Sequence, residues 1–169
     1  MKKKILIIKT SALGDVIQCF SVLNFLKDKF PQAKISFVVE NSFASLLESH
    51  PFISKVLPIE MKKWKKRPLS LKTFKQVRIF FSSLRKEKYD LLIDLQGNIK
   101  SASIVLFSKA KEKVGFSFGS APEWPSALFL SHRYCPLKKD PMPLQYLTLI
   151  QKHFQLTPYF VSPNTSLHI

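Results

Sequence analysis

The sequence predicts an α/β protein with a Rossmann-like parallel sheet and helices on both faces. Short apolar runs alternate along the chain with segments whose apolar residues recur every three or four positions, as strands and helices do in parallel α/β proteins. The first run, residues 5–8, is apolar at every position, which is typical of a strand buried on both faces. At 169 residues, 46% of them apolar, the chain is long enough for one domain with a substantial core.

The first half of the chain supplies three of the expected strands. After the apolar run and a polar turn, a helix begins near Asp15 and ends before Pro31, because proline cannot continue a helix. The other elements expected here are a second strand at 35–39, a short helix at 42–47 and a third strand at 55–59. Pro58 lacks a backbone N–H, which predicts that the third strand lies at an edge of the sheet.

The second half continues the alternation. A helix over 70–88 is expected to bury a stripe formed by Phe74, Val77, Phe81 and Leu84. The remaining elements are a fourth strand at 90–94, a helix through 104–106, a fifth strand at 114–116, a loop over 117–143 and a last helix at 144–154. We therefore assign residues 1–156 to one domain, and 157–169 to a linker and the start of a missing second domain.

The net charge of +16 implies an anionic partner: a phosphorylated small molecule, an acidic membrane face or nucleic acid. The positive charge is concentrated between Glu60 and Glu87, where ten Lys or Arg occur and no acidic residue does. Residues 61–67, Met-Lys-Lys-Trp-Lys-Lys-Arg, are either a solvated loop or a clamp for phosphate or carboxylate groups. In the clamp, Trp64 would anchor the loop or meet a sugar face. Basic residues around an aromatic ring also suit single-stranded nucleic acid.

Asp15 is placed where the first strand gives way to the first helix. Ligands of open α/β sheets bind outside the carboxyl ends of the strands, so an acid at this point is a candidate for chemistry. The plainer interpretation makes Ser11 or Asp15 a cap or first-turn acid, favoured by the helix dipole. Lys9 and the helix N-terminus both favour the charged carboxylate, which is able to accept a proton. The single glycine here, Gly14, matches neither the dinucleotide fingerprint nor the phosphate loop, so nucleotide binding by this segment is not predicted.

A second polar segment, residues 94–102, follows the fourth strand. Gln96 and Lys100 are candidates to face the same crevice as Asp15. In the alternative, Asn98 or Ser101 caps the next helix and Lys100 is solvated.

Several functions are not expected. The four histidines are scattered without ligand spacing, so no metal site is predicted, and no serine occurs in a nucleophile elbow. Cys19 and Cys135 have no motif spacing and are expected to be reduced thiols. The apolar run after Met1 is too short for a signal peptide or a membrane span, which predicts a cytoplasmic protein.

The segments that carry a resemblance to a known family are 9–16 (Lys-Thr-Ser-Ala-Leu-Gly-Asp-Val), Glu40, 62–66 (Lys-Lys-Trp-Lys-Lys), 94–97 (Asp-Leu-Gln-Gly), 100–102 (Lys-Ser-Ala) and 121–123 (Ala-Pro-Glu). In order and spacing they resemble the N-terminal half of the lipopolysaccharide heptosyltransferases of glycosyltransferase family 9, those of type I in particular. The likeness covers residues 1–155. Family members often carry arginine where Pro122 stands and use it on the acceptor, so that contact is missing here.

The resemblance implies a GT-B enzyme, in which two Rossmann-like domains face each other across a cleft. This chain would be the N-terminal domain, which binds the Kdo of the inner core on lipid A. The absent domain would bind the donor, ADP-heptose, and transfer would invert the anomeric centre without cofactor or metal ion. Asp15 would be the general base. The residues implied to bind the acceptor are Lys62, Lys63, Lys66, Ser11, Gly14, Gln96 and Lys100.

The resemblance also implies peripheral association with the anionic cytoplasmic face of the inner membrane, and a separate donor-binding chain is one way to complete the enzyme. Nucleic acid is then not the expected partner. Two alternatives stay open: a non-catalytic basic module that binds acidic lipid or nucleic acid, and a truncated, inactive remnant.

Overall fold

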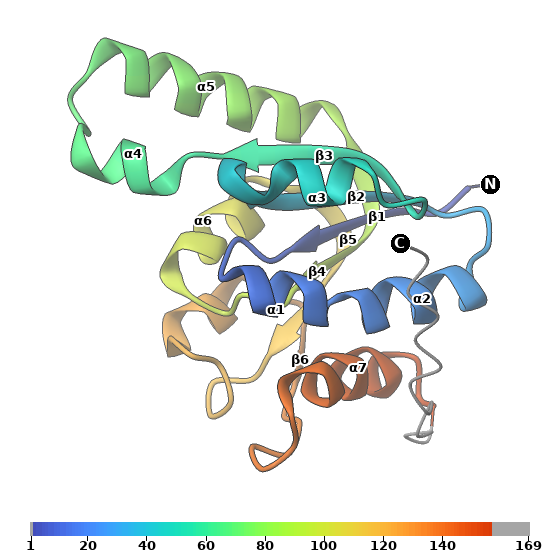
Figure 1. Ribbon diagram of the computed structural model, residues 1–169. Helices are drawn as coiled ribbons and strands as arrows, with labels where there is room; N and C mark the ends of the chain where they lie inside the picture. Colours follow the sequence, from blue (N-terminus) through green and yellow to red (C-terminus); the bar gives the residue numbers. More distant parts are fainter. Residues whose placement is uncertain (1, 157–169) are drawn as a thin grey trace.

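The computed structural model describes residues 2–156, which form one sheet of six parallel strands in the order β3-β2-β1-β4-β5-β6 (Figure 1). The strands are β1 (Lys4–Ile8), β2 (Lys34–Glu40), β3 (Ile53–Ile59), β4 (Lys88–Asp94), β5 (Lys109–Phe116) and β6 (His132–Tyr134). The predicted fold class is confirmed. The carboxyl ends of all six strands lie at one edge of the sheet, which we call the carboxyl edge.

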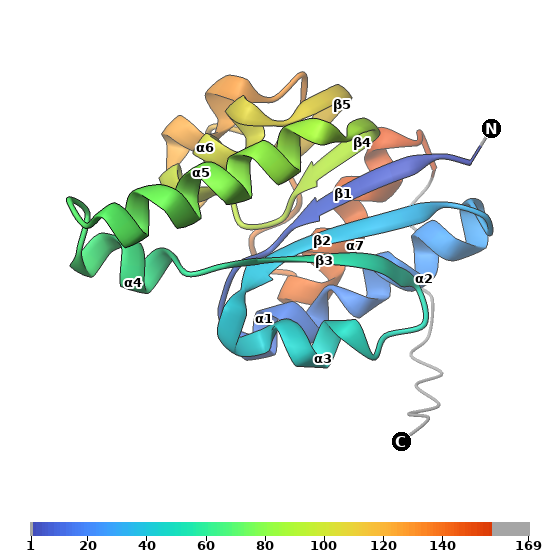
Figure 2. The ribbon, with the colours of Figure 1, turned by 90° about the horizontal axis from the view of Figure 1, so that it is seen from above.

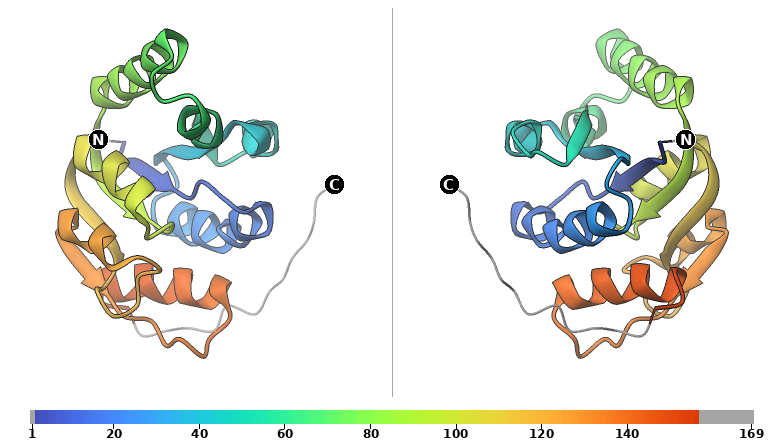
Figure 3. Two further views of the ribbon diagram at one scale, coloured as in Figure 1. Left: turned by 90° about the vertical axis from the view of Figure 1, so that its left-hand side faces the viewer. Right: turned by 90° about the vertical axis from the view of Figure 1, so that its right-hand side faces the viewer.

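Helices cover both faces of the sheet, as the end-on views show (Figure 3). One face carries α1 (Leu13–Gln18), α2 (Phe20–Lys29), the 3₁₀ turn η1 (Asn41–Phe43), α3 (Ala44–Glu48) and α7 (Met142–His153). The other face carries α4 (Met61–Lys66), α5 (Leu71–Lys86), α6 (Ile99–Phe107) and the 3₁₀ segment η2 (Trp124–Phe129).

The side chains of the central strand β1 require a layer of helices on each face of the sheet. Ile5 and Ile7 pack into the core under α1, α2 and α7, whereas Leu6 and Ile8 pack into the core under α4, α5 and α6. All four side chains are fully buried. Because successive side chains of a strand point to opposite faces, a continuous apolar run requires cover on both. The interpretation of residues 5–8 as a doubly buried strand is confirmed.

The edge position expected from Pro58 is also confirmed, because β3 is the first strand of the sheet and pairs only with β2. Pro58 therefore removes no hydrogen bond from a central strand.

Three expected elements differ from the structure. The first helix is divided into α1 and α2 at Cys19. The basic segment, expected as a loop, forms the helix α4, and its Trp64 is buried against Phe80 instead of being free to meet a sugar face. The expected loop 117–143 contains η2 and the strand β6, a three-residue His-Arg-Tyr segment with no apolar run to signal it.

The buried stripe of α5 is rotated from the expected one. Phe80 and Leu84 are buried together with Thr73, whereas Phe74 is 67% exposed. Val77 and Phe81 pack at the margin of the same core. The predicted linker 157–169 lies outside the described residues.

Candidate functional site

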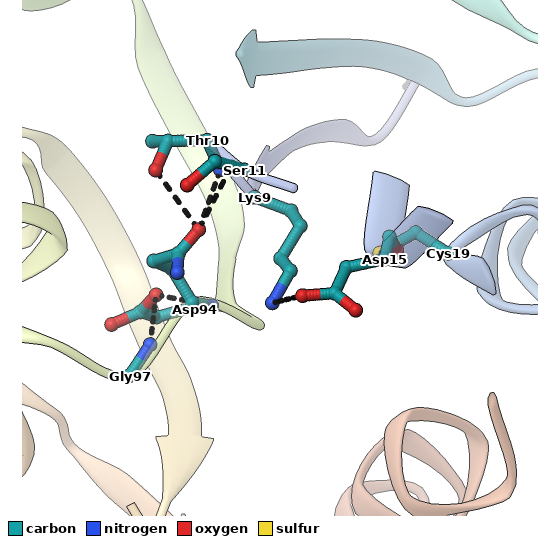
Figure 4. Close-up of polar contacts among 8 residues, drawn as sticks. Lys9, Thr10, Ser11, Asp15, Cys19, Asp94 and Gly97 are labelled. Carbon is teal, nitrogen blue, oxygen red and sulfur yellow. Dashed lines mark hydrogen bonds and ion pairs between the residues drawn. The ribbon is translucent and has the colours of Figure 1, made fainter. Parts of the chain in front are cut away.

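The candidate site lies at the carboxyl edge, where the loop after β1 leads into α1. The N-cap of α1 is Ala12, which makes no side-chain cap, so Ser11 is not the cap that the plainer interpretation allowed. Asp15 lies in the first turn, as expected, and its side chain is 39% exposed. Oδ2 of Asp15 is paired with Lys9, while Oδ1 makes no hydrogen bond within residues 2–156 (Figure 4). An open carboxylate oxygen at this position is able to accept a proton from a bound hydroxyl group.

The buried Lys9 side chain pairs with this carboxylate from the protein side. Its ammonium nitrogen is 3.1 Å from Oδ2 of Asp15, although the lysine side chain is only 4% exposed. The same nitrogen lies 5.3 Å from the ring centroid of Tyr146 on α7, within the range of a cation–π interaction. Lys9 is therefore held between a carboxylate and an aromatic face, so its charge is compensated although little water reaches it.

Cys19 lies one turn after Asp15 and donates a hydrogen bond from Sγ to the backbone oxygen of Asp15, at 3.2 Å. Burial raises the pKa of its thiol to about 12. A thiol that is neutral at physiological pH is not a nucleophile. Cys19 thus supports the helix through its hydrogen bond to Asp15, and its buried, protonated thiol is not an activated nucleophile.

Gln96 braces the loop that leads to Asp15. Its side-chain oxygen accepts hydrogen bonds from the backbone nitrogen of Thr10 (2.8 Å), the hydroxyl of Thr10 (2.9 Å) and the backbone nitrogen of Ser11 (3.1 Å). The sequence suggested that Gln96 faces a crevice shared with Asp15. In the structure its oxygen joins the loop after β4 to the loop after β1, which leads to Asp15.

Asp94 holds the turn that presents Gln96. Its carboxylate accepts hydrogen bonds from the backbone nitrogens of Gln96 (3.0 Å) and Gly97 (3.1 Å) and from the hydroxyl of Ser101 (2.8 Å). Complete burial raises the pKa of Asp94 to about 6, and these hydrogen bonds together with Lys9 limit the rise. Asp94 is therefore a buried support of the loop.

The start of α6 agrees with the prediction that Asn98 or Ser101 caps this helix. Asn98 accepts from the backbone nitrogen of Ser101 at 3.0 Å, and Ser101 accepts from that of Asn98 at 3.1 Å, which forms a capping box. Lys100 is exposed on the first turn. Glu123 accepts a further hydrogen bond from the backbone nitrogen of Ile99, at 2.8 Å.

Proline fits at position 122 because Gly97, which it packs against, has no side chain. Gly97 has a φ of +65°, and a Cβ at this position would come within 2.8 Å of Cδ of Pro122. Pro122 thus packs over the β4–α6 turn at the carboxyl edge. Gly14 is different: it lies exposed in the first turn of α1, and a Cβ there would meet nothing within 4 Å. The fold itself gives no reason for a glycine at position 14.

The predicted cationic residues Lys62, Lys63 and Lys66 are exposed on α4, which follows β3 at the same carboxyl edge as Asp15 (Figure 1). Lys63 pairs with Glu60 at 2.6 Å, and this hydrogen bond lowers the pKa of Glu60. Lys62 and Lys66 make no ion pair within the described part of the chain, so their charges are available to a ligand.

A network beneath α4 fixes its orientation. Trp64 donates from Nε1 to Gln76 on α5 at 3.2 Å, and Gln76 donates to Glu60 at 3.3 Å. A cavity of about 350 Å³ opens beside this network, lined by Leu57, Trp64, Gln76, Ile79 and Phe80 among others. The cavity adjoins α4, and Asp15 is not among its lining residues.

Residues 2–156 contain no cluster of three or more His, Cys, Asp or Glu arranged to hold a metal ion. No helix among them is long and apolar enough to span a bilayer.

Sequence reasoning missed two parts of the site. Thr10 enters only as a turn residue in the sequence, yet it is buried and supplies two of the three donors to Gln96. Tyr146 comes from the other end of the chain, and the apolar pattern of the last helix does not indicate that its ring contacts Lys9. No local signal in the sequence identifies that contact.

A Rossmann-like sheet with a carboxylate and exposed lysines at its carboxyl edge is the architecture of a ligand-binding α/β domain. The family described as glycosyltransferase family 9 (heptosyltransferase) matches residues 77–167. The chain belongs to this family.

Individual relatives agree with this assignment. Lipopolysaccharide heptosyltransferase 1 of Escherichia coli K12 is 31% identical over 131 residues, 78% of this chain and 41% of that protein. The Campylobacter coli protein of the same name is 32% identical over 157 residues, 93% of this chain and 43% of that protein. The structure of the E. coli heptosyltransferase WaaC with ADP superposes with a TM-score of 0.87 at 26% identity, over 93% of this chain and 49% of that one. The chain thus spans less than half the length of the curated relatives that it matches.

Proposed function

We propose that this chain is the acceptor-binding half of an inverting glycosyltransferase, which transfers heptose from ADP-heptose to a Kdo residue of the lipopolysaccharide inner core. One observation carries the proposal. The Asp15 carboxylate stands partly open at the carboxyl edge, with Oδ2 fixed by the buried Lys9 and Oδ1 free. This is the geometry of a general base awaiting a hydroxyl group.

The proposed reaction uses that geometry. The attacking Kdo hydroxyl donates a hydrogen bond to Oδ1 of Asp15, and its proton passes to the carboxylate as the new bond to the heptose anomeric carbon forms. The bond from that carbon to the diphosphate breaks on the opposite face, which inverts the centre and releases ADP. A positioned general base contributes roughly 10²–10⁴-fold to the rate. Lys9 holds the carboxylate at one angle throughout.

The lysines of α4 recognise the acceptor's charge. Lys62 and Lys66 present exposed ammonium groups without an ion-pair partner in residues 2–156, which act as point charges toward phosphate and carboxylate groups, and the exposed Lys63 adds its charge although it pairs with Glu60. Ser11, Gly14 and Lys100 contribute from the loops after β1 and β4. ADP-heptose is bound mainly by a donor half of the GT-B type, and the enzyme works at the cytoplasmic face of the inner membrane.

Acceptor binding by this chain tests the proposal without a donor half. Binding of soluble, deacylated Kdo-bearing lipid A is measured by calorimetry over a range of salt concentrations, beside a single-stranded DNA of equal charge. We expect tighter binding of the Kdo acceptor, and a loss of affinity in the Lys62→Ala/Lys66→Ala variant. Arg85→Ala, at the far end of α5, is the matched control.

The alternative function, a basic module without sugar specificity, makes the opposite prediction. Its affinities for the Kdo acceptor and for DNA would be equal and would fall together with salt, because counterion release dominates such binding. That result would overturn the proposal.

A further inference from the structure

The connection between α4 and α5 carries large apolar side chains that the fold does not bury. Leu69 is 99% exposed and Leu71 is 88% exposed, more than any other large apolar residue in the described chain. Phe74 follows on the first turns of α5 and is exposed as well. Side chains so open to water contribute almost nothing to the core, and all three fall within residues 69–74 of one protruding segment.

Positive charge surrounds these apolar residues. We define the hairpin tip as residues 65–75, Lys-Lys-Arg-Pro-Leu-Ser-Leu-Lys-Thr-Phe-Lys. It contains no acidic residue and five cations, all exposed: Lys65, Lys66, Arg67, Lys72 and Lys75. A partner that covers the leucines must therefore tolerate or neutralise a dense positive charge.

The hairpin tip also projects from the body of the protein. In both the side view and the view from above, the α4–α5 connection extends beyond the carboxyl edge, farther than α1 or α6 (Figures 1 and 2). A flat surface can thus touch the tip without first meeting the rest of the domain.

We propose that the hairpin tip docks on an anionic lipid bilayer, with Leu69, Leu71 and Phe74 inserted at the boundary between headgroups and acyl chains. Exposed apolar side chains ringed by lysine and arginine are what an interfacial segment requires: apolar area for the acyl boundary and cations for acidic headgroups. A purely electrostatic contact would not need the leucines, and a purely apolar one would not need five cations. If the proposed function holds, this docking also brings the carboxyl edge, with Asp15, toward a lipid-linked acceptor.

Vesicle binding tests the proposal independently of glycosyl transfer, because the vesicles contain no Kdo. The chain is sedimented with phosphatidylcholine vesicles or with vesicles that also contain anionic phosphatidylglycerol, at about 0.15 M salt and above, where the Debye length is about 8 Å or less. The test variant is Leu69→Ser/Leu71→Ser. The control is Leu137→Ser, a 59% exposed leucine that also precedes two lysines, Lys138 and Lys139. Circular dichroism checks the fold of each variant.

We expect binding to anionic vesicles that falls by about tenfold or more in the double leucine variant and less than about twofold in the control, since each inserted leucine adds apolar burial. Three results would overturn the proposal. The double variant binds as tightly as the parent; or salt abolishes the binding of both equally, which indicates charge alone; or the parent self-associates without vesicles and the double variant does not, which makes a second copy the occupant.

Discussion

Lys9 and Asp15 form an ion pair of 3.1 Å in which the lysine is buried and the aspartate is open to solvent. The two residues come from the end of β1 and the first turn of α1, so the pair spans the loop that forms the site. Removing the acid would leave an ammonium group with little access to water, in contact with the ring of Tyr146 and with Asp94 as the remaining acid that interacts with it. The carboxylate therefore has a structural role as well as the proposed chemical one, and the two roles can be separated by experiment.

The first prediction concerns this pair. Asp15→Asn should lower the free energy of unfolding by about 1–2 kcal/mol: breaking a buried pair costs roughly 3–5 kcal/mol, and the exposure of Asp15 reduces this by solvent screening. Lys9→Met combined with Asp15→Asn should recover most of the loss, as urea denaturation would show. Asp28→Asn, an exposed acid on α2, is the control. Strictly additive effects of the two substitutions would mean that the pair does not couple the loop to α1.

The second prediction concerns Gly14, for which the fold supplies no packing reason. Gly14→Ala should leave the protein as stable as the parent, or more stable by about 0.5–1 kcal/mol, because alanine is the better helix residue. Acceptor affinity should nevertheless fall, since a methyl group would occupy the surface on which the acceptor approaches α1. Gly119→Ala, also with nothing within 4 Å, is the matched control. Unchanged affinity would remove Gly14 from the acceptor site.

The third prediction concerns Gln96, which acts on the site through Thr10 and Ser11. It is measured in the two-domain protein, by which we mean this chain joined to the donor half of a family 9 relative. Gln96→Ala should lower kcat by roughly tenfold or more with a smaller change in KM, because misplacing the β1–α1 loop misplaces Asp15. Gln96→Glu retains an acceptor oxygen and should recover part of the rate. A rise in KM alone would indicate that Gln96 instead contacts the acceptor.

The fourth prediction is a pH dependence that arises from Asp94. Burial raises its pKa in the folded protein from 3.8 to about 6, so the folded state holds the proton more tightly than the unfolded state. This contribution to stability is complete below about pH 4 and is lost as the pH rises through about 6, by up to about 3 kcal/mol.

Asp94→Asn isolates this contribution. The amide keeps an oxygen for Gln96 and Gly97 and can donate to Ser101, whose hydroxyl still reaches the backbone oxygen of Asn98 at 2.9 Å. The stability of the parent minus that of the variant should fall between about pH 4 and pH 7. Other groups, such as Glu60, whose pKa is lowered, cancel in the difference. A difference that is constant with pH would contradict the assignment.

Local pattern was enough to predict much of the fold. The doubly buried run 5–8, the edge strand marked by Pro58 and the acid at the start of the first helix all follow from short stretches of sequence. The strand β6 was missed because three polar and aromatic residues give no period to detect. The predicted buried stripe of α5 was wrong at Phe74, because this large apolar residue resembles a core residue in sequence but lies on the exposed side of the helix.

The positions of the candidate site residues were predictable from the sequence, and their contacts less so. Placement of Asp15 and the lysines of α4 at one edge follows from the rule for parallel sheets. Thr10 donates a hydrogen bond to Gln96, which lies 86 positions away in the sequence. Lys9 contacts Tyr146, which comes from the opposite end of the domain. Such pairs depend on how the layers pack, which local sequence does not encode.

The most direct test of the proposed chemistry is heptose transfer by the two-domain protein with Asp15→Asn, measured as ADP release from ADP-heptose in the presence of the Kdo acceptor. We predict that kcat falls by about 10²–10⁴-fold while acceptor affinity and the circular dichroism spectrum stay close to those of the parent. Turnover at the parent rate in a folded Asp15→Asn protein would contradict the assignment of Asp15 as the general base.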